Sequence, residues 1–215
     1  ASSTDPSWEM FLARSSPSGS SYIENPSQYE SGYSGGRSYS LNLYGGTFVD
    51  SSWYSRPACG PTAALNLLIY WARCKGYSSF ITEAYPFTSI YNYLYDTSGT
   101  SGSSTSLGNL QSALQSYVNT KYPVGSSDFF YVVNDLWVTQ SDITSSIESG
   151  IPLIYQVQGS TVYGNHFAMA YGFQYFTYSS RTSYYIRIMD GHSTSQNRYV
   201  HFDDATSRAT IRIFQ

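Results

Sequence analysis

Residues 58–74 read ACGPTAALNLLIYWARC, and this stretch decides the fold. Apolar residues recur on nearly every side of the helix that it predicts, which is typical of a helix buried all round. Pro61 suits the first turn, where a missing N–H costs nothing, and Gly76 is a suitable stop. The stretch therefore predicts a central, buried helix that begins at Cys59.

The two cysteines of the chain, Cys59 and Cys74, stand at opposite ends of this helix. At about 1.5 Å per residue they are roughly 22 Å apart, whereas a disulfide needs Cα atoms within about 7 Å. Both thiols are therefore expected to be free. Only Cys59 lies at the helix N-terminus, where the dipole favours a thiolate. Cys59 is the candidate nucleophile, and a buried packing cysteine is the alternative.

The remaining pattern runs from helices to strands. A second helix is expected from about Ser106, and a third near Thr139, where Thr139 and Asp142 resemble a capping box. Near-alternation of apolar and polar residues then predicts strands over 151–157, 166–173, 183–190, 198–202 and 208–214. Helices followed by antiparallel strands make an α+β order.

A length of 215 residues suits a single domain with a real core. We predict one domain over 1–215, with a mainly helical half over 46–150 and a mainly β half over 151–215. Residues 1–45 are rich in Ser, Gly, Tyr and Pro, and we expect them to wrap over the domain as a strap. A disordered linker is the alternative, and 15–20 is expected to be a loop.

The composition excludes several classes of protein. Charged residues make up only 12%, yet no apolar run has the length of a transmembrane helix, so no membrane-spanning segment is expected. A net charge of −3 gives no basic footprint for nucleic acid. The 23 tyrosines and many serines are typical of secreted or cell-surface proteins, although no signal-peptide pattern is visible. We expect a monomer without a cofactor.

His166 opens one predicted strand, and Asp190 ends the next. If these strands form a hairpin closed near residue 178, pairing Phe173 with Ser183 also pairs His166 with Asp190. Paired side chains on one face lie about 4.5–5.5 Å apart at Cβ. That spacing suits a carboxylate that holds an imidazole in one tautomer. An error of one residue would turn one side chain to the other face.

Two further histidines compete for this role. His192 follows Asp190 in a predicted loop, and His201 precedes a polar stretch, so surface positions are expected for both. A metal site built from Asp190, His192 and His201 is the alternative. It is set aside because no spacing in the chain has the character of zinc ligands.

Four segments resemble one family. Residues 58–64, ACGPTAA, resemble the start of the nucleophile helix in papain-like cysteine peptidases, especially the bacterial C39-like group. Residues 150–159, GIPLIYQVQG, and 164–173, GNHFAMAYGF, resemble streptopain and the same C39-like peptidases, where a Pro-led strand precedes the strand bearing the base. Residues 186–191, IRIMDG, resemble the strand that ends in the third catalytic residue. The order Cys, His, Asp agrees with the family over roughly 58–203.

The resemblance implies a papain-like α+β fold, in which a helical half carries the nucleophile helix against an antiparallel β half. It implies a secreted bacterial cysteine endopeptidase with Cys59 as nucleophile, His166 as base and Asp190 as orienting group. Peptide bonds of a protein or peptide substrate would be hydrolysed through a thioester acyl-enzyme. The alternatives are a cell-wall peptide amidase or acyltransferase with the same triad, and a non-catalytic adhesion or carbohydrate-binding module. Aromatic-rich stretches such as 91–95 would serve such a module, unless they pack a helix.

The chain departs from the family pattern at two places. The family usually places a Gln shortly before the nucleophile, but residues 50–58 contain none. We expect the Cys59 N–H to supply one oxyanion donor and the Ser52 hydroxyl or the Trp53 indole to supply the second. Streptopain-like enzymes also carry Trp residues after the third catalytic residue, where residues 191–194 here read GHST. The sequence leaves that wall of the site undefined.

Overall fold

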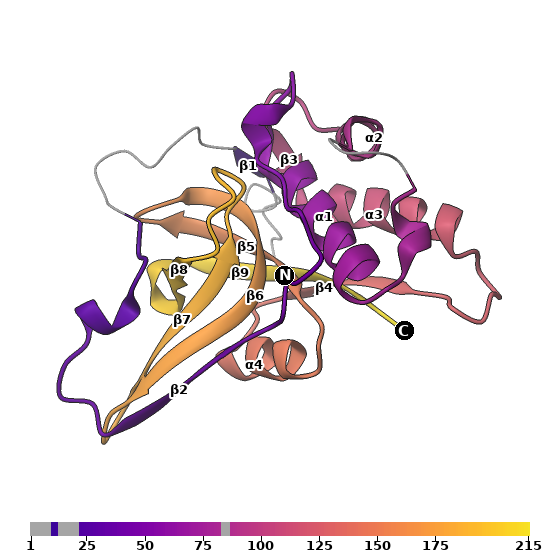
Figure 1. The fold of residues 1–215 in the computed structure, drawn as a ribbon. Coiled ribbons are helices and arrows are strands. Elements are labelled where there is room, and N and C mark those ends of the chain that lie inside the picture. Colours follow the sequence, from indigo (N-terminus) through magenta and orange to yellow (C-terminus); the bar gives the residue numbers. More distant parts are fainter. Residues whose placement is uncertain (1–9, 13–21, 83–86) are drawn as a thin grey trace, which may run out of the picture.

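The computed structural model describes residues 10–12, 22–82 and 87–215, with only the backbone for 10–12. Three helices gather on one side of the molecule, and an antiparallel sheet lies beside them (Figure 1). The predicted α+β order is confirmed. The expected loop at 15–20 lies outside the described residues.

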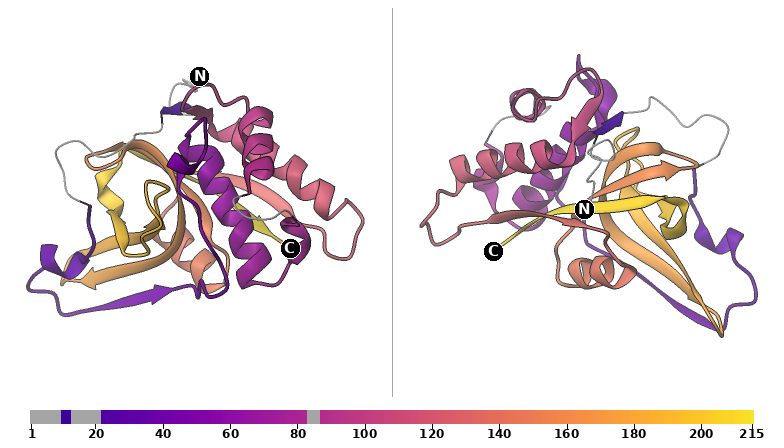
Figure 2. Two further views of the ribbon diagram at one scale, coloured as in Figure 1. Left: turned by 45° about the horizontal axis from the view of Figure 1, so that its top comes forward. Right: turned by 180° about the vertical axis from the view of Figure 1, so that it is seen from behind.

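The central helix α1 spans Cys59–Ile69 and continues as a π-helical turn over Tyr70–Cys74. Every residue of α1 is buried, as its all-round apolar pattern predicts. The π-helical turn ends before Gly76, whose φ of +86° suits glycine. On one side α1 packs against the sheet, and on the other it packs against α2 and α3 (Figures 1 and 2).

The other helices begin where side chains cap them. Ser106 accepts a hydrogen bond from the Asn109 N–H at 3.1 Å, at the start of α3. Thr139 and Asp142 form the predicted capping box of α4, with bonds of 3.1 and 2.8 Å. The helices are α2 Thr88–Thr97, α3 Leu107–Lys121, α4 Gln140–Glu148 and the 3-10 turns Pro26–Tyr29, Ser51–Trp53, Ser78–Phe80 and Phe202–Asp204. None of the described helices is long and apolar enough to cross a membrane.

The stretch 91–95 packs a helix rather than lining an exposed loop. It lies in α2, where Tyr91, Leu94 and Tyr95 are buried. The Tyr91 hydroxyl also donates to the Arg56 carbonyl at 2.7 Å and accepts from the Ala58 N–H at 2.9 Å. Tyr91 therefore holds the chain that leads into Cys59.

A seven-stranded antiparallel sheet forms the β half, in the order β4-β9-β5-β6-β7-β8, with β2 paired to β6. The strands of this sheet are β2 Gly35–Ser40, β4 Tyr131–Leu136, β5 Leu153–Ser160, β6 Gly164–Thr177, β7 Thr182–Met189, β8 Arg198–His201 and β9 Ser207–Phe214. The five predicted strands correspond to β5 through β9. β2 and β4 were not predicted, and they bring part of the N-terminal strap and part of the mainly helical half into the sheet.

Two glycines allow β2 to pair closely with β6. A Cβ on Gly36 would lie 2.3 Å from the Tyr175 carbonyl oxygen, and a Cβ on Gly172 would lie 2.3 Å from the Ser40 hydroxyl oxygen. Only residues without a side chain fit these positions. The polar, glycine-containing sequence of β2 lacks the alternation that predicts a strand, which explains why it was expected to be an irregular strap.

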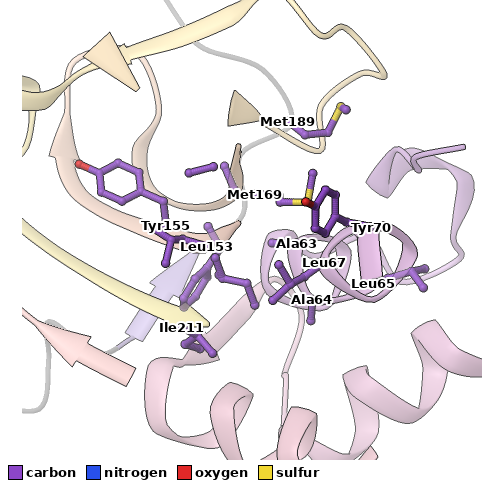
Figure 3. Packing of buried hydrophobic residues seen from close by; sticks show 14 of the residues in the cluster. Ala63, Ala64, Leu65, Leu67, Tyr70, Leu153, Tyr155, Met169, Met189 and Ile211 are labelled. Carbon is purple, nitrogen blue, oxygen red and sulfur yellow. The ribbon is translucent and has the colours of Figure 1, made fainter. Parts of the chain in front are cut away.

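Apolar side chains lock α1 onto the sheet. Ala63 and Leu67 of α1 lie against Met169 of β6 and Leu153 of β5 (Figure 3), and all four are at most 2% exposed. Burial of one such large side chain stabilises the fold by about 1.5–3 kcal/mol. This packing holds the N-terminus of α1 at the junction with β6.

A second, two-stranded sheet lies beside the start of α1. It pairs β1, Met10–Leu12, with β3, Ser104–Ser106. A Cβ on Gly60 would lie 3.0 Å from the Thr105 hydroxyl oxygen, so β3 packs directly on the first turn of α1. The backbone of β1 therefore runs close to the junction of the two halves (Figure 1).

Candidate active site

Cys59 is the first residue of α1, and its side chain is 3% exposed. The main-chain N–H groups of Phe167, Cys59 and Gly60 lie within hydrogen-bonding reach of its sulfur. Burial nevertheless raises the pKa of the thiol from 9.0 to about 11, and these N–H groups oppose the rise. The resting site therefore holds Cys59 as a neutral thiol next to the strand that carries His166.

His166 lies in β6 and is 1% exposed. Its Nε2 is 2.6 Å from the main-chain carbonyl oxygen of Asp190. Because a carbonyl oxygen only accepts, Nε2 carries the hydrogen and Nδ1 is left as an acceptor. Nδ1 is buried and has no hydrogen-bond partner among the described residues. The ring therefore holds an unused lone pair, as a general base requires.

The surroundings of His166 keep its ring neutral. Burial lowers the pKa of His166 from 6.5 to about 3, the neighbouring His192 adds to this effect, and Asp190 opposes it. A neutral imidazole can accept a proton from the thiol. Cys59 and His166 thus both rest in their uncharged forms.

The structure brings Asp190 to His166, but through its main chain and not through its carboxylate. Oδ2 of Asp190 accepts from the Tyr163 hydroxyl at 2.9 Å and from Nη1 of Arg198 at 2.5 Å. Oδ1 accepts from the N–H of His192 at 3.0 Å. The carboxylate is fully buried and occupied on both oxygens. The expected carboxylate–imidazole hydrogen bond is therefore replaced by a carbonyl–imidazole hydrogen bond.

The predicted hairpin register was wrong. Phe173 pairs with Ile186, and Ser183 pairs with Phe176. The turn is closed by the Tyr178 N–H and the Arg181 carbonyl at 2.8 Å, which moves its centre beyond residue 178. An irregularity between Ala170 and Gly172 then shifts the pairing again. Neither the turn nor this shift is visible in the alternation of apolar residues.

The actual register explains why His192 lies beside His166. β6 pairs Met169 with Met189, so the chain leaves β7 beside the part of β6 that carries His166, and His192 follows three residues later. The two imidazole rings stack with centroids 4.6 Å apart and planes 19° apart. Tyr163 stacks on His166 from 5.1 Å. The surface position expected for His192 is therefore corrected, because its ring is half-buried in the site.

Within the stretch 191–194 that the sequence left undefined, His192 is the residue whose ring stacks on His166. It lies two residues after Asp190, in the region where streptopain-like enzymes carry Trp residues, and this offset is the one signal that could have identified it. Burial lowers the pKa of His192, which favours the uncharged form of its ring.

Ser52 and Trp53, the candidate oxyanion donors, lie in the 3-10 turn before Cys59. The turn is tied to the loop after Asp190 by the Ser51 N–H, which donates to the Gly191 carbonyl at 2.9 Å. The main-chain N–H of Ser52 is bound to Asp50 Oδ1 at 2.8 Å, and the side chains of Ser52 and Trp53 are exposed. Their role as oxyanion donors stays a prediction.

Cys74 and His201 lie in other surroundings. Both cysteines are free, as predicted, and Cys74 is half-buried at the rim of a hollow of about 470 Å³ between α1 and the strap. His201 Nδ1 accepts from the Asp203 N–H at 3.2 Å, so Nε2 carries the hydrogen that it shares with Ser183 at 2.9 Å. His201 in this tautomer cannot serve Ser183 as a base. Within the described parts of the chain, no cluster of three His, Cys, Asp or Glu side chains could hold a metal ion.

Comparison with known proteins places the chain among peptidase-like sequences. The model of the Peptidase_C39 like family matches residues 48–211, a range that contains Cys59, His166 and Asp190. A crystal structure provisionally assigned as a C39-like peptidase from Bacillus anthracis is similar, with a TM-score of 0.49 and 12% identity. That alignment covers 80% of this chain and 97% of the other. No curated protein matches the chain.

Proposed function

This chain belongs to the Peptidase_C39 like family, and from that premise we propose that it is a cysteine endopeptidase. In this proposal Cys59 is the nucleophile, His166 is the base, and Asp190 orients the base through its carbonyl oxygen. The observation that carries the proposal is the 2.6 Å contact of His166 Nε2 with that carbonyl, because it leaves Nδ1 as the acceptor. The thiol adjoins the main chain at Phe167, the residue after His166.

The neutral pair defines the first chemical step. Nδ1 of His166 takes the proton of the Cys59 thiol, and the sulfur attacks the carbonyl carbon of the peptide bond. The N–H of Cys59 stabilises the negative charge that develops on the carbonyl oxygen. His166 then returns the proton to the leaving amine, and water hydrolyses the thioester. Burial opposes either charge alone, so thiolate and imidazolium form together as adjacent opposite charges.

The substrate class follows from the family and from the composition. A protein or peptide is the proposed substrate, and a bacterial source is proposed from the family resemblance. A secreted or cell-surface location is proposed from the tyrosine- and serine-rich, weakly charged composition. A cell-wall peptide amidase or acyltransferase would use the same three residues. Mass spectrometry of products formed with and without an added amine separates hydrolysis from acyl transfer.

The sharpest test uses the two cysteines as an internal pair. The reduced protein is treated with a peptidyl epoxide that traps activated thiols, and each cysteine-containing peptide is quantified by mass spectrometry. Cys59 should react at least about a hundredfold faster than Cys74, although Cys74 is the more exposed thiol. His166→Gln should abolish the preference. Equal, slow labelling of both thiols, with no hydrolysis of a labelled protein substrate, would favour the non-catalytic binding module.

A further inference from the structure

Arg198, the first residue of β8, forms a buried ion pair that the proposed chemistry does not use. Its Nη1 lies 2.5 Å from Oδ2 of Asp190, and the two side chains are 13% and 0% exposed. Burying two charges is costly, and such a pair often stabilises a fold less than apolar residues of the same size would. Because Asp190 also supplies the carbonyl that contacts His166, this pair calls for a role other than stability.

Two contacts orient the Arg198 guanidinium. Besides Asp190, it lies over the ring of Tyr22, with Cζ 3.6 Å from the ring centroid. Tyr22 in turn packs on Tyr163, with ring centroids 5.8 Å apart. Tyr163 donates its hydroxyl to the same carboxylate oxygen that Arg198 binds. The guanidinium and the phenol thus hold the Asp190 side chain from one side.

As a result, the carboxylate and the main-chain carbonyl of Asp190 bind different partners. The carboxylate is directed to Arg198, Tyr163 and the N–H of His192, and the carbonyl oxygen is directed to His166. A free carboxylate beside an imidazole would compete for the same ring hydrogen, because a charged acceptor binds more strongly than a neutral one.

We propose that Arg198 is a positioning residue: its guanidinium holds the Asp190 carboxylate away from the His166 ring, so that the Asp190 carbonyl binds Nε2–H and Nδ1 stays free for the Cys59 proton. The inference rests on the proposed function only for the last clause. The position and tautomer of the ring follow whether or not the protein cleaves peptides.

The charges around His166 make the effect of Arg198 measurable as a change in the pKa of His166. His166 faces Tyr163, His192 and Asp190, and the next residue, Phe167, meets the Cys59 sulfur through its N–H. Behind Asp190 lie Arg198, Tyr22 and Asp50. In the native site the positive charge of the Arg198 guanidinium compensates the negative charge of the Asp190 carboxylate. Without it, an uncompensated buried carboxylate would favour the imidazolium and raise the pKa of His166, by about 1–3 units for a charge within 4–6 Å.

The test follows His166 directly by NMR, in a chain with three histidines. The ¹⁵N shifts of the ring report the tautomer, and a pH titration reports the midpoint. Arg198→Met should raise the His166 midpoint by at least about one pH unit and mix the two tautomers. Arg198→Lys should give a smaller shift, because it keeps the charge but not the planar guanidinium that lies over the Tyr22 ring.

A double variant separates positioning from a merely structural role. Arg198→Met combined with Asp190→Asn removes both charges, and it should return the His166 midpoint and tautomer close to the native values. The matched control is Arg187→Met, because Arg187 also lies over aromatic rings, Tyr171 and Tyr199, but its hydrogen bonds go to Ser40, Gln196 and Asn197. It should leave the titration unchanged.

Two results would overturn the inference. One is a native tautomer and midpoint in Arg198→Met, with a loss of melting temperature like that of Arg187→Met. The other is a double variant as strongly shifted as the single one. If Arg198→Met does not fold, Arg198→Lys and the double variant decide between the same outcomes. A native-like protein that fails the epoxide test but shows the NMR shift would disprove the peptidase proposal and keep this one.

Discussion

The helix formed by α1 and its π-helical turn carries a cysteine thiol at each end, and the two thiols lie in different surroundings. Cys59 begins the helix, is 3% exposed and meets the N–H groups of Phe167 and Gly60, whereas Cys74 ends the π-helical turn, is half-buried and opens onto a hollow. Burial raises the pKa of both thiols. The direction of this shift therefore does not distinguish the two thiols. The difference is that the Cys59 sulfur meets the N–H of Phe167 in β6, the strand that carries His166.

The first prediction tests whether Cys59 and Cys74 differ in function. Cys59→Ala should abolish hydrolysis of a fluorescently labelled protein substrate, a loss of at least about a thousandfold, because the nucleophile is removed. Cys74→Ala should change the rate less than about twofold. The measurement is the initial rate under reducing conditions. Equal effects of the two substitutions would mean that the helix N-terminus has no special role.

The second prediction contrasts two histidines. His166→Gln should lower kcat by about a hundredfold to ten-thousandfold, the usual contribution of a general base. His201→Ala should have little effect, because His201 bonds Ser183 and the Asp203 N–H. Circular dichroism checks that both variants are folded. A large loss in His201→Ala with an active His166→Gln would show that the wrong imidazole was assigned.

The third prediction concerns stability at the Cys59 end. Asp190→Asn leaves the buried Arg198 charge unpaired and should lower the free energy of unfolding by about 3–5 kcal/mol. The control is Asp135→Asn, which breaks the more exposed 3.3 Å pair with Arg212 and should cost at most about 1 kcal/mol. Urea unfolding compares the two. A similar, small loss for both would show that the Asp190–Arg198 pair behaves like a surface pair.

The smallest expected effect is a pH dependence of stability. The folded pKa of Cys59, about 11, exceeds 9.0, so its contribution is present below pH 9 and is lost as the pH rises through 11. The folded pKa of His166, about 3, lies below 6.5, so its contribution is present above pH 6.5 and is lost as the pH falls through 3. Stability should therefore be greatest between these windows.

Substitution of each cysteine tests the loss of stability expected between pH 9 and 11. Cys59→Ala should flatten the decrease in unfolding free energy between pH 9 and 11 by about 2–3 kcal/mol. Cys74→Ala should flatten it less, because Cys74 is only half-buried. Thermal melts across the pH range measure both, and identical profiles for the two variants would contradict the unequal burial of the thiols.

Local sequence patterns accounted for most elements of the fold. The helix from Cys59, the capping box at Thr139 and five of the strands were predicted, because apolar periodicity and capping are read within a few residues. β2 and β4 were missed. β2 has no apolar alternation, and its pairing depends on a close approach to β6 that Gly36 and Gly172 allow. β4 is an edge strand whose pairing with β9 is set by residues more than 70 positions away.

The sequence by itself identified Cys59, His166 and Asp190 as the candidate site residues, through their order and the family resemblance. Only the tertiary structure decided which atoms meet. The turn at Tyr178–Arg181 and the shift after Ala170 set the register, and together they put His192 over the His166 ring. Arg198, from the next strand, binds the Asp190 carboxylate, and the Asp190 carbonyl binds the imidazole of His166. Such contacts depend on the summed geometry of three strands and a loop, and no local pattern of residues records that geometry.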